Sequence, residues 1–222
     1  SWSKLQDIDF DGDGRFEAIQ PVFDDPDANP EALAILRGAD SAAGALRVRN
    51  NNRVYRSQGL QVSLEKPFDT GSLRHNLTVS ARIHEDEEDR LQNEDFYSQT
   101  AGDLVFVRQT ALGAQANREA KADAIAFYFE DRIEFGRLTL TPGIRYEGIT
   151  LTRLDYDRDD PERLAGPTRT RKTNIDEWLP ALGATYDLGN VRLIAGVSRG
   201  FSPPGPGNPD ARAEKSWNYE AG

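Results

Sequence analysis

The feature that most constrains the fold is an alternation of apolar and polar residues in the second half of the chain. The clearest alternating runs are 125–129, 138–146, 182–188 and 191–197. A β-strand turns successive side chains to opposite faces, so each run has one apolar face and one polar face. The polar faces are rich in Arg, Glu, Thr, Ser and Gly. This pattern predicts an all-β fold, and it suits a membrane barrel with a water-filled interior at least as well as a soluble sheet.

The composition favours the barrel. Of the 222 residues, 37% are hydrophobic and 29% are charged. The hydrophobic share is lower than in most globular domains, so a soluble core would be thin. A barrel avoids this difficulty because lipid covers its outside and water fills its inside. The chain contains no Cys, which excludes disulfides, thiol catalysis and Cys-ligated metals.

Charge is distributed unevenly along the chain. The formal net charge of −10 argues against a nucleic-acid partner. The acidic residues cluster at 7–31, 85–95 and 155–162, between the alternating runs. Much of the charge is therefore expected in solvated loops.

The connections between the predicted strands alternate between short and long. Tight turns are predicted near residues 70, 136 and 189, and the long loops at 1–50, 87–119, 155–173 and 202–211. Outer-membrane barrels have short periplasmic turns and long extracellular loops. The sequence therefore predicts a section of an antiparallel up-and-down transmembrane β-barrel with long extracellular loops.

Two regions are expected on this basis. Residues 1–51 form an extracellular loop region with an acidic, Asp-rich segment and a short helix that begins at Pro30 and stops before Gly38. Residues 52–222 form a partial barrel of about seven strands. The chain starts without Met and stops inside a predicted strand, so we expect it to be a piece of a longer protein.

The sharpest local motif lies in the acidic segment. Alternate carboxylates followed by Gly14 match D-x-D-x-D-G, the opening of a calcium loop. The candidate ligands are Asp9, Asp11, Asp13, Arg15 through its backbone carbonyl, and Glu17. The twelfth position is Gln20 where an EF-hand has Glu, and the flanks are not helical. The segment is therefore either a calcium loop of another kind or a solvated acidic turn.

Arginines are the main candidates for ligand recognition, because a guanidinium binds two carboxylate oxygens at once. Those on polar strand faces, which we expect mostly to pair with nearby Glu residues, are Arg82, Arg132, Arg145 and Arg192. Those near the long loops, which are the predicted substrate-binding residues, are Arg90, Arg153, Arg169 and Arg171. The two histidines, His75 and His84, fall on opposite faces of one strand and do not form a metal pair. The sequence offers no catalytic cluster, so an enzyme is not predicted.

Several segments, in order, resemble the barrel of TonB-dependent outer-membrane receptors. The segments are 126–132 with 140–147, then 178–183, 200–204 and 214–222. Two further segments, 51–59 and 84–90, resemble the ferric citrate type of receptor. The resemblance covers about residues 50–222, and the ordered set is more specific than any single piece.

The resemblance implies a barrel of about 22 strands plugged by an N-terminal domain that this chain lacks. It implies uptake of ferric chelates, either iron–siderophore complexes or ferric citrate, across the outer membrane of a Gram-negative bacterium. The expected partners are the ferric chelate, outer-membrane lipid and the TonB energy-transducing complex, which would act through the missing N-terminal part. No cofactor is required; calcium is the one candidate, and iron enters only as chelated substrate.

A second class of protein stays open at this point. A secreted calcium-binding β-domain for adhesion or recognition would also combine alternating strands with an acidic loop. In that case the apolar residues of the strands would pack on a second sheet, whereas in a barrel they would face lipid.

Overall fold

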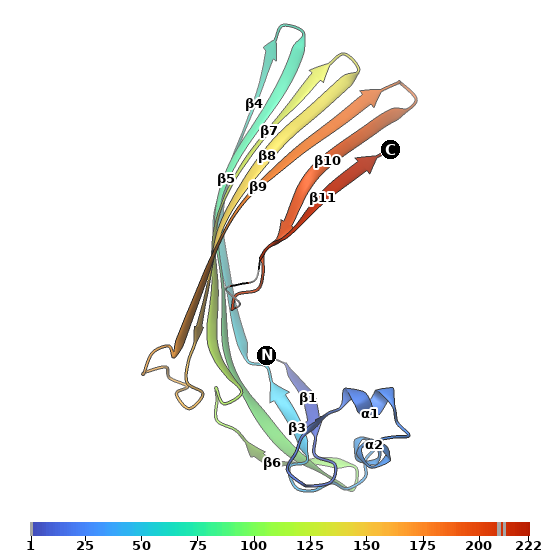
Figure 1. Ribbon diagram of the computed structural model, residues 1–222, viewed down its shortest axis with the longest axis vertical. Coiled ribbons are helices and arrows are strands. Elements are labelled where there is room, and N and C mark those ends of the chain that lie inside the picture. Colours follow the sequence, from blue (N-terminus) through green and yellow to red (C-terminus); the bar gives the residue numbers. More distant parts are fainter. Residues whose placement is uncertain (1, 208–209, 211) are drawn as a thin grey trace. The chain divides into compact units, whose positions relative to one another are not determined.

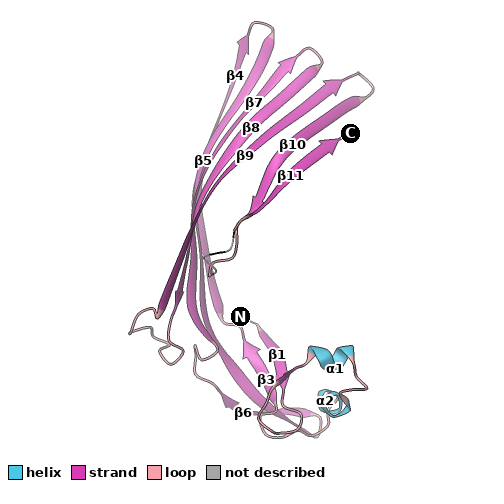
Figure 2. Cartoon of the chain, in the orientation of Figure 1, coloured by secondary structure: helices cyan, strands magenta, loops and turns pink. Residues whose placement is uncertain are grey.

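The computed structural model describes residues 2–207, 210 and 212–222, most of them in antiparallel strands with two short helices (Figures 1 and 2). The strands are β1 (Ser3–Ile8), β2 (Glu17–Ala18), β3 (Leu46–Asn50), β4 (Arg53–Thr70), β5 (Leu73–Thr100), β6 (Asp103–Gln109), β7 (Ala116–Phe135), β8 (Leu138–Asp155), β9 (Arg169–Asp187), β10 (Arg192–Ser202) and β11 (Glu214–Ala221). The helices are α1 (Gln20–Asp24) and α2 (Pro30–Leu36). None of the described helices is long and apolar enough to cross a membrane.

The strands join one sheet in the order β11-β10-β9-β8-β7-β5-β3-β1-β2, and β4 and β6 also pair with β5. From β7 to β11, and for β4 and β5, consecutive strands lie side by side, as in an up-and-down topology, whereas β7 pairs with β5 because β6 folds back on β5. The all-β antiparallel prediction is confirmed, and within the described residues the barrel is not closed. Part of the predicted loop at 202–211, namely residues 208, 209 and 211, lies outside the described residues.

The chain divides into two compact units. The first, which we call the wall unit, consists of Tyr55–Glu87, Ala120–Arg153 and Thr170–Gly222. It contains the three predicted tight turns, and each has a glycine with positive φ: Gly71 (62°), Gly136 (59°) and Gly189 (92°). Hairpin turns of this length need left-handed residues, which glycine supplies without a Cβ clash.

The register of the wall unit separates two faces. Leu182 lies opposite Val197, which lies opposite Tyr219. The next row pairs Ala181 with Ser198, which in turn pairs with Asn218. Cross-strand partners point to the same side of a sheet, so apolar and polar rows alternate across β9, β10 and β11. We call the two sides the apolar face and the polar face.

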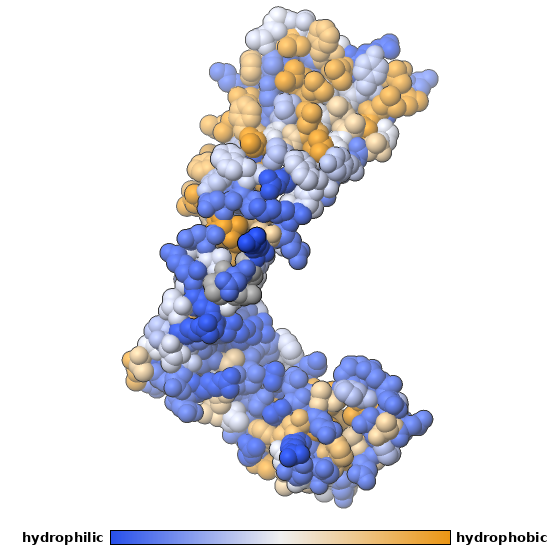
Figure 3. Space-filling view, viewed as in Figure 1, coloured by the Kyte–Doolittle hydropathy of each residue, from blue (hydrophilic) through white to orange (hydrophobic). Residues whose placement is uncertain are grey.

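The apolar face is open. Large apolar side chains on it remain about half exposed, for example Phe127 at 55% and Leu193 at 50%. Figure 3 shows hydrophobic residues gathered over the part of the wall unit that carries the tight turns. Within the described part of the chain, no second sheet is packed against this face. The face therefore has the exposure that lipid would cover.

The second unit, which we call the loop unit, consists of the chain up to Val54, Glu88–Glu119 and Leu154–Arg169. It has a small hydrophobic core formed by Ile8, Val22, Ala32, Ile35 and Leu46. The short helix predicted from Pro30 is confirmed as α2. The expectation that residues 1–51 are mainly loop is wrong, because β1 pairs with β3 and α1 packs into the same core.

The expectation of a long polar loop over 87–119 is also wrong. β5 continues to Thr100 and pairs with β3 on one side and β6 on the other. Asp95, for example, lies opposite both Val48 and Gln109. Paired strands on both sides satisfy the backbone of β5, so the strand persists although most of its side chains are polar in this part.

Candidate functional site

The predicted substrate-binding arginines are divided between the two units. Arg90 is largely buried in the loop unit, and its guanidinium pairs with Glu88 at 2.8 Å. Arg169, the first residue of β9, is exposed in the same unit. In the wall unit Arg171 is half-buried in β9. Arg153 packs closely on Gly207, because a Cβ added to Gly207 would lie 2.7 Å from Arg153 Nη1. Arg90 shares Glu88 with Arg53, and the role of all four arginines as ligand contacts stays a prediction.

Arg163 is a key residue of the loop unit that the sequence reasoning missed. Its side chain is only 15% exposed, and it pairs with Glu119 and, at 2.5 Å, with Asp89. Its Nε donates to Asn117 Oδ1 at 2.8 Å, and its guanidinium lies 4.6 Å from the ring centroid of Tyr156. The sequence offered one indication, an arginine at the end of a strongly acidic run. Its partners, however, are distant in sequence.

Asn117 adds hydrogen bonds to the same loop, which connects β8 and β9. Its side-chain amide donates to the backbone carbonyls of Asp157, at 2.7 Å, and Asp160, at 2.9 Å. The Tyr156 hydroxyl donates to Glu119 at 2.8 Å. Burial, and then this hydrogen bond, raise the pKa of Tyr156 to about 12, so the hydroxyl stays protonated and continues to donate at neutral pH. The loop between β8 and β9 is therefore fixed to the first residues of β7.

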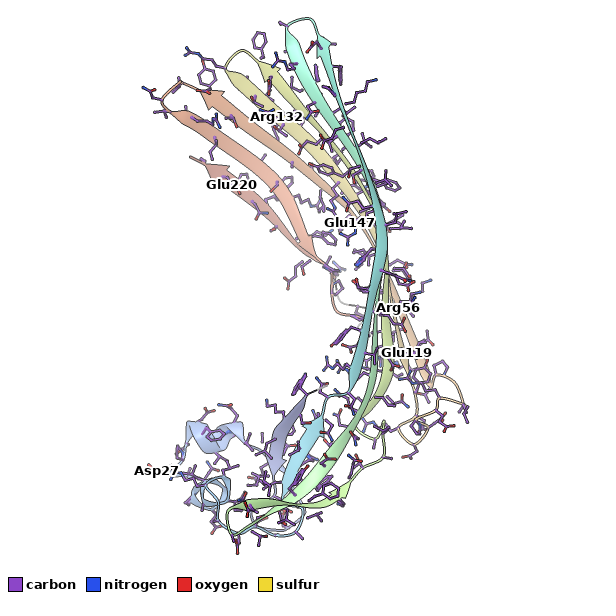
Figure 4. The ribbon with its side chains drawn as sticks, turned by 180° about the vertical axis from the view of Figure 1, so that it is seen from behind. Asp27, Arg56, Glu119, Arg132, Glu147 and Glu220 are labelled. Atoms are coloured by element: carbon purple, nitrogen blue, oxygen red, sulfur yellow. The ribbon has the colours of Figure 1, made fainter. Side chains whose placement is uncertain are left out.

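The polar face of the wall unit carries several ion pairs. Three of its four predicted arginines pair with acids, as expected: Arg132 with Glu134 at 2.7 Å, Arg145 with Glu147, and Arg192 with Asp187 at 3.7 Å. Figure 4 shows the side chains on the strands, with Arg132 and Glu147 labelled. The fourth, Arg82, lines with Arg145 and Tyr128 a polar hollow of about 230 Å³.

Two carboxylates of β8 and β9 are nearly buried beside cations. Glu147 is 9% exposed next to Arg145, and Glu177 is 7% exposed. Glu177 accepts from Lys215 at 2.5 Å and lies 3.7 Å from Arg199. Buried charges need partners, and these pairs supply them. This arrangement suits a surface that faces water or polar groups.

The histidines do not meet, as expected. His75 pairs with Asp131 at 2.7 Å, whereas His84 pairs with Asp86 at 3.1 Å. Among the described residues, one group of acidic or metal-ligating side chains comes close enough to hold an ion, and it is Asp9, Asp11 and Asp13.

The acidic loop brings together three of its five candidate ligands. One carboxylate oxygen from each of Asp9, Asp11 and Asp13 lies within 4.8 Å of the others. The nearly buried Asp9 accepts from the amides of Gly12 at 2.9 Å and Gly14 at 3.0 Å. These bonds orient both Asp9 oxygens without a cation. Arg15 contributes its amide to Asp13 at 2.8 Å, and Glu17 lies in β2.

Calcium binding by this loop is a prediction that calorimetry can check. The full-length protein titrated with Ca²⁺ is expected to bind one ion in the range of about 10⁻⁴ to 10⁻³ M, as extracellular calcium modules do. Asp11→Asn with Asp13→Asn should weaken binding at least tenfold, because two charges are removed. Asp24→Asn with Asp27→Asn is the matched control outside the motif. Absence of heat at millimolar Ca²⁺ would leave the loop as a solvated acidic turn.

The fold and the two faces define a class of protein, the outer-membrane β-barrels, whose walls meet lipid on one side and a polar interior on the other. The chain matches the family described as TonB dependent receptor-like, beta-barrel, over residues 5–222, and it belongs to that family. The resemblance seen in the sequence is therefore confirmed.

One solved structure similar to this chain is the crystal structure of the ferric citrate transporter FecA in the unliganded form. The TM-score is 0.58 and the sequence identity is 22% over 70% of this chain. At this identity the likeness establishes the fold. The chain covers 22% of the length of that structure. No curated protein matches the chain.

Proposed function

We propose that this chain forms part of the wall of an outer-membrane receptor that takes up a ferric chelate, either an iron–siderophore complex or ferric citrate, with energy supplied through TonB. The observation that carries the proposal is the two-sided wall unit. Its apolar face exposes Leu182 and Phe127 to what would be lipid, and its polar face carries paired arginines and buried carboxylates. A soluble protein would have to cover the apolar face.

Membership of the family supports the transport class, and residue chemistry supports an anionic chelate. Carboxylates of a chelate are well matched to the guanidinium fork. The arginines that we propose as ligand contacts near the long loops are Arg90, Arg153, Arg169 and Arg171. TonB would act through a part of the receptor outside this chain, and the outer membrane of a Gram-negative bacterium would be its location.

The open strand edges fit a larger wall. β4 is exposed along almost its whole length, and all residues of β11 are exposed. An unpaired strand edge is prone to aggregation, and barrels remove this hazard by pairing each edge with another strand. Further strands of a complete receptor would pair with β4 and β11. The alternative of a secreted calcium-binding β-domain is less well supported, because it needs a second sheet over the apolar face.

Uptake by the full-length receptor tests the proposal. Cells whose only ferric-chelate receptor is this protein should accumulate ⁵⁵Fe from ferric citrate or from a siderophore, and should lose this uptake when TonB is absent. Cobalamin, which is not a ferric chelate, serves as the control substrate. Uptake of no ferric chelate, or uptake that is independent of TonB, would contradict the proposal.

Substitutions of the arginines near the long loops can be tested in the same uptake assay. Arg169→Ala and Arg171→Ala should each raise the concentration for half-maximal uptake roughly 10- to 100-fold, since a charge-assisted hydrogen bond is worth about 1.5–3 kcal/mol. Arg192→Ala, near a tight turn, is the matched control and should have little effect. Equal effects of all three variants would remove the assignment of Arg169 and Arg171 to ligand contact.

A further inference from the structure

A groove on the apolar face of the wall unit marks the boundary where apolar side chains give way to polar ones. Along five neighbouring strands the change occurs within two to four residues: Leu60 to Gln58, Ile83 to Glu85, Ile125 to Asp123, Tyr146 to Thr150 across Gly148, and Trp178 to Asp176. The polar end always lies away from the tight turns. The aligned change defines one edge of the apolar band.

Tyr146 lies at this edge of the apolar band, with its ring on one side and its hydroxyl on the other. Its ring lies 5.0 Å from that of Trp178 and 6.4 Å from that of Phe127, between centroids, on the apolar side. Its hydroxyl donates to Asp176 at 2.6 Å on the polar side. A tyrosine with an apolar body and a hydrogen-bonded hydroxyl is typical of a membrane–water interface.

The groove at this edge is large and has a glycine in its floor. Its volume is about 890 Å³, within the range of small-molecule sites. Gly148 keeps it open, because a Cβ there would lie 3.0 Å from Tyr146 Oη and 3.2 Å from Ile125 Cγ1. Next to it, and sharing Tyr146, is an apolar groove of about 440 Å³ that includes Val62, Ala81 and Trp178. Together they offer one compartment of mixed lining, which we call the polar compartment because it holds the carboxylates, and one apolar compartment.

The polar compartment accepts more hydrogen bonds than it donates. Three carboxylates, those of Glu85, Asp123 and Asp176, line it. Among the described residues, Lys121 is bonded to two of them, at 2.8 Å from Glu85 and 3.2 Å from Asp123, and Arg56 acts on Glu85 from nearby. Three negative charges and two positive charges leave a net of −1, which disfavours a phosphate head. The carboxylates suit a head group that carries many hydroxyl donors.

We propose that this pair of grooves binds a glycolipid, with its sugar hydroxyls on Asp123, Asp176 and Glu85 and an acyl chain in the apolar groove. The inference rests on the proposed membrane location of the wall unit, but not on the identity of the transported chelate. The bound lipid would hold the receptor at a fixed depth, because the sugar and the chain are recognised on opposite sides of Tyr146.

Native mass spectrometry of full-length receptor tests this site. Protein in a zwitterionic detergent is mixed with diglucosyl diacylglycerol, phosphatidylglycerol or diacylglycerol of identical acyl chains. The glycolipid should be retained at least tenfold better than either of the others. Asp123→Ala should remove this preference. Asp187→Ala is the matched control, since both side chains are 49% exposed and each has an arginine or lysine partner.

Two further arms keep the outcomes distinct. Gly148→Val fills the groove and should also abolish retention of the glycolipid, provided the variant keeps its β-sheet circular dichroism. If Gly148→Val loses this circular dichroism, the test rests on Asp123→Ala. Equal retention of the three lipids would overturn the proposal. Retention of phosphatidylglycerol that requires Mg²⁺ and is lost in EDTA would also overturn it, by showing a cation site. Iron uptake is measured separately, so loss of lipid binding with intact uptake would leave the proposed function standing.

Discussion

Replacing Leu182 by Arg is expected to remove most of the full-length receptor from the outer membrane. Leu182 is 46% exposed on the apolar face, opposite Val197. On β9 it lies halfway between Trp178 and Tyr186, which are on the same face. Arginine on the lipid side of a barrel costs about 2–4 kcal/mol at the bilayer midplane. This penalty is a large part of the stability of an ordinary folded protein.

The neighbouring residue supplies the matched control. Ala181 is exposed on the polar face, opposite Ser198, so Ala181→Arg places the same charge in water. The free energy of unfolding of each receptor, reconstituted in lipid vesicles, is measured by urea titration. We expect Leu182→Arg to lower it by about 2–4 kcal/mol and Ala181→Arg to change it by less than about 1 kcal/mol. Equal destabilisation by both variants would mean that the two faces do not differ in their surroundings.

The hairpins of the wall unit were predictable because their determinants are local. One or two residues after each strand end, a glycine takes the left-handed conformation, as Gly189 does between β9 and β10. The alternation on either side then sets which face each residue occupies, because slipping the register by one residue would turn every apolar side chain of a strand to the polar face. Leu193 opposite Tyr186 shows that register.

The loop unit was less predictable because the second half of β5 is mostly polar on both faces. The second half of β5 has Gln92 and Asn93 buried and charged residues around them. A period-2 signal needs one face in an apolar environment. Here pairing with β3 and β6 keeps the strand extended, and that pairing depends on residues far away in sequence. The acidic loop, by contrast, was predictable because its three aspartates are adjacent in sequence.

Arg163 could not be found from the sequence for the same reason, since Asn117 is 46 residues and Asp89 is 74 residues away. Arg163→Ala is expected to release the loop between β8 and β9. The side chain is 15% exposed, and removing one partner of a buried ion pair costs about 3–5 kcal/mol. Because Asp89 is 41% and Glu119 is 30% exposed, water screens the carboxylates that lose their cation, and we expect the lower end of this range. Hydrogen exchange of backbone amides 156–168 measures the effect.

Arg163→Gly separates the ionic contribution from backbone strain. Arg163 has φ of 58°, a left-handed conformation that costs a residue with a Cβ about 1–2 kcal/mol. Glycine loses the ion pairs but relieves this strain, so its loop should be protected better than that of Arg163→Ala by about 1 kcal/mol. Arg169→Ala, at an exposed site close by, is the control and should leave protection unchanged. Protection in Arg163→Ala equal to that of the unmodified receptor would show that backbone pairing alone holds the loop. Protection lost only in Arg163→Gly would show that the greater backbone freedom of glycine, and not the loss of the ion pairs, decides the order of the loop.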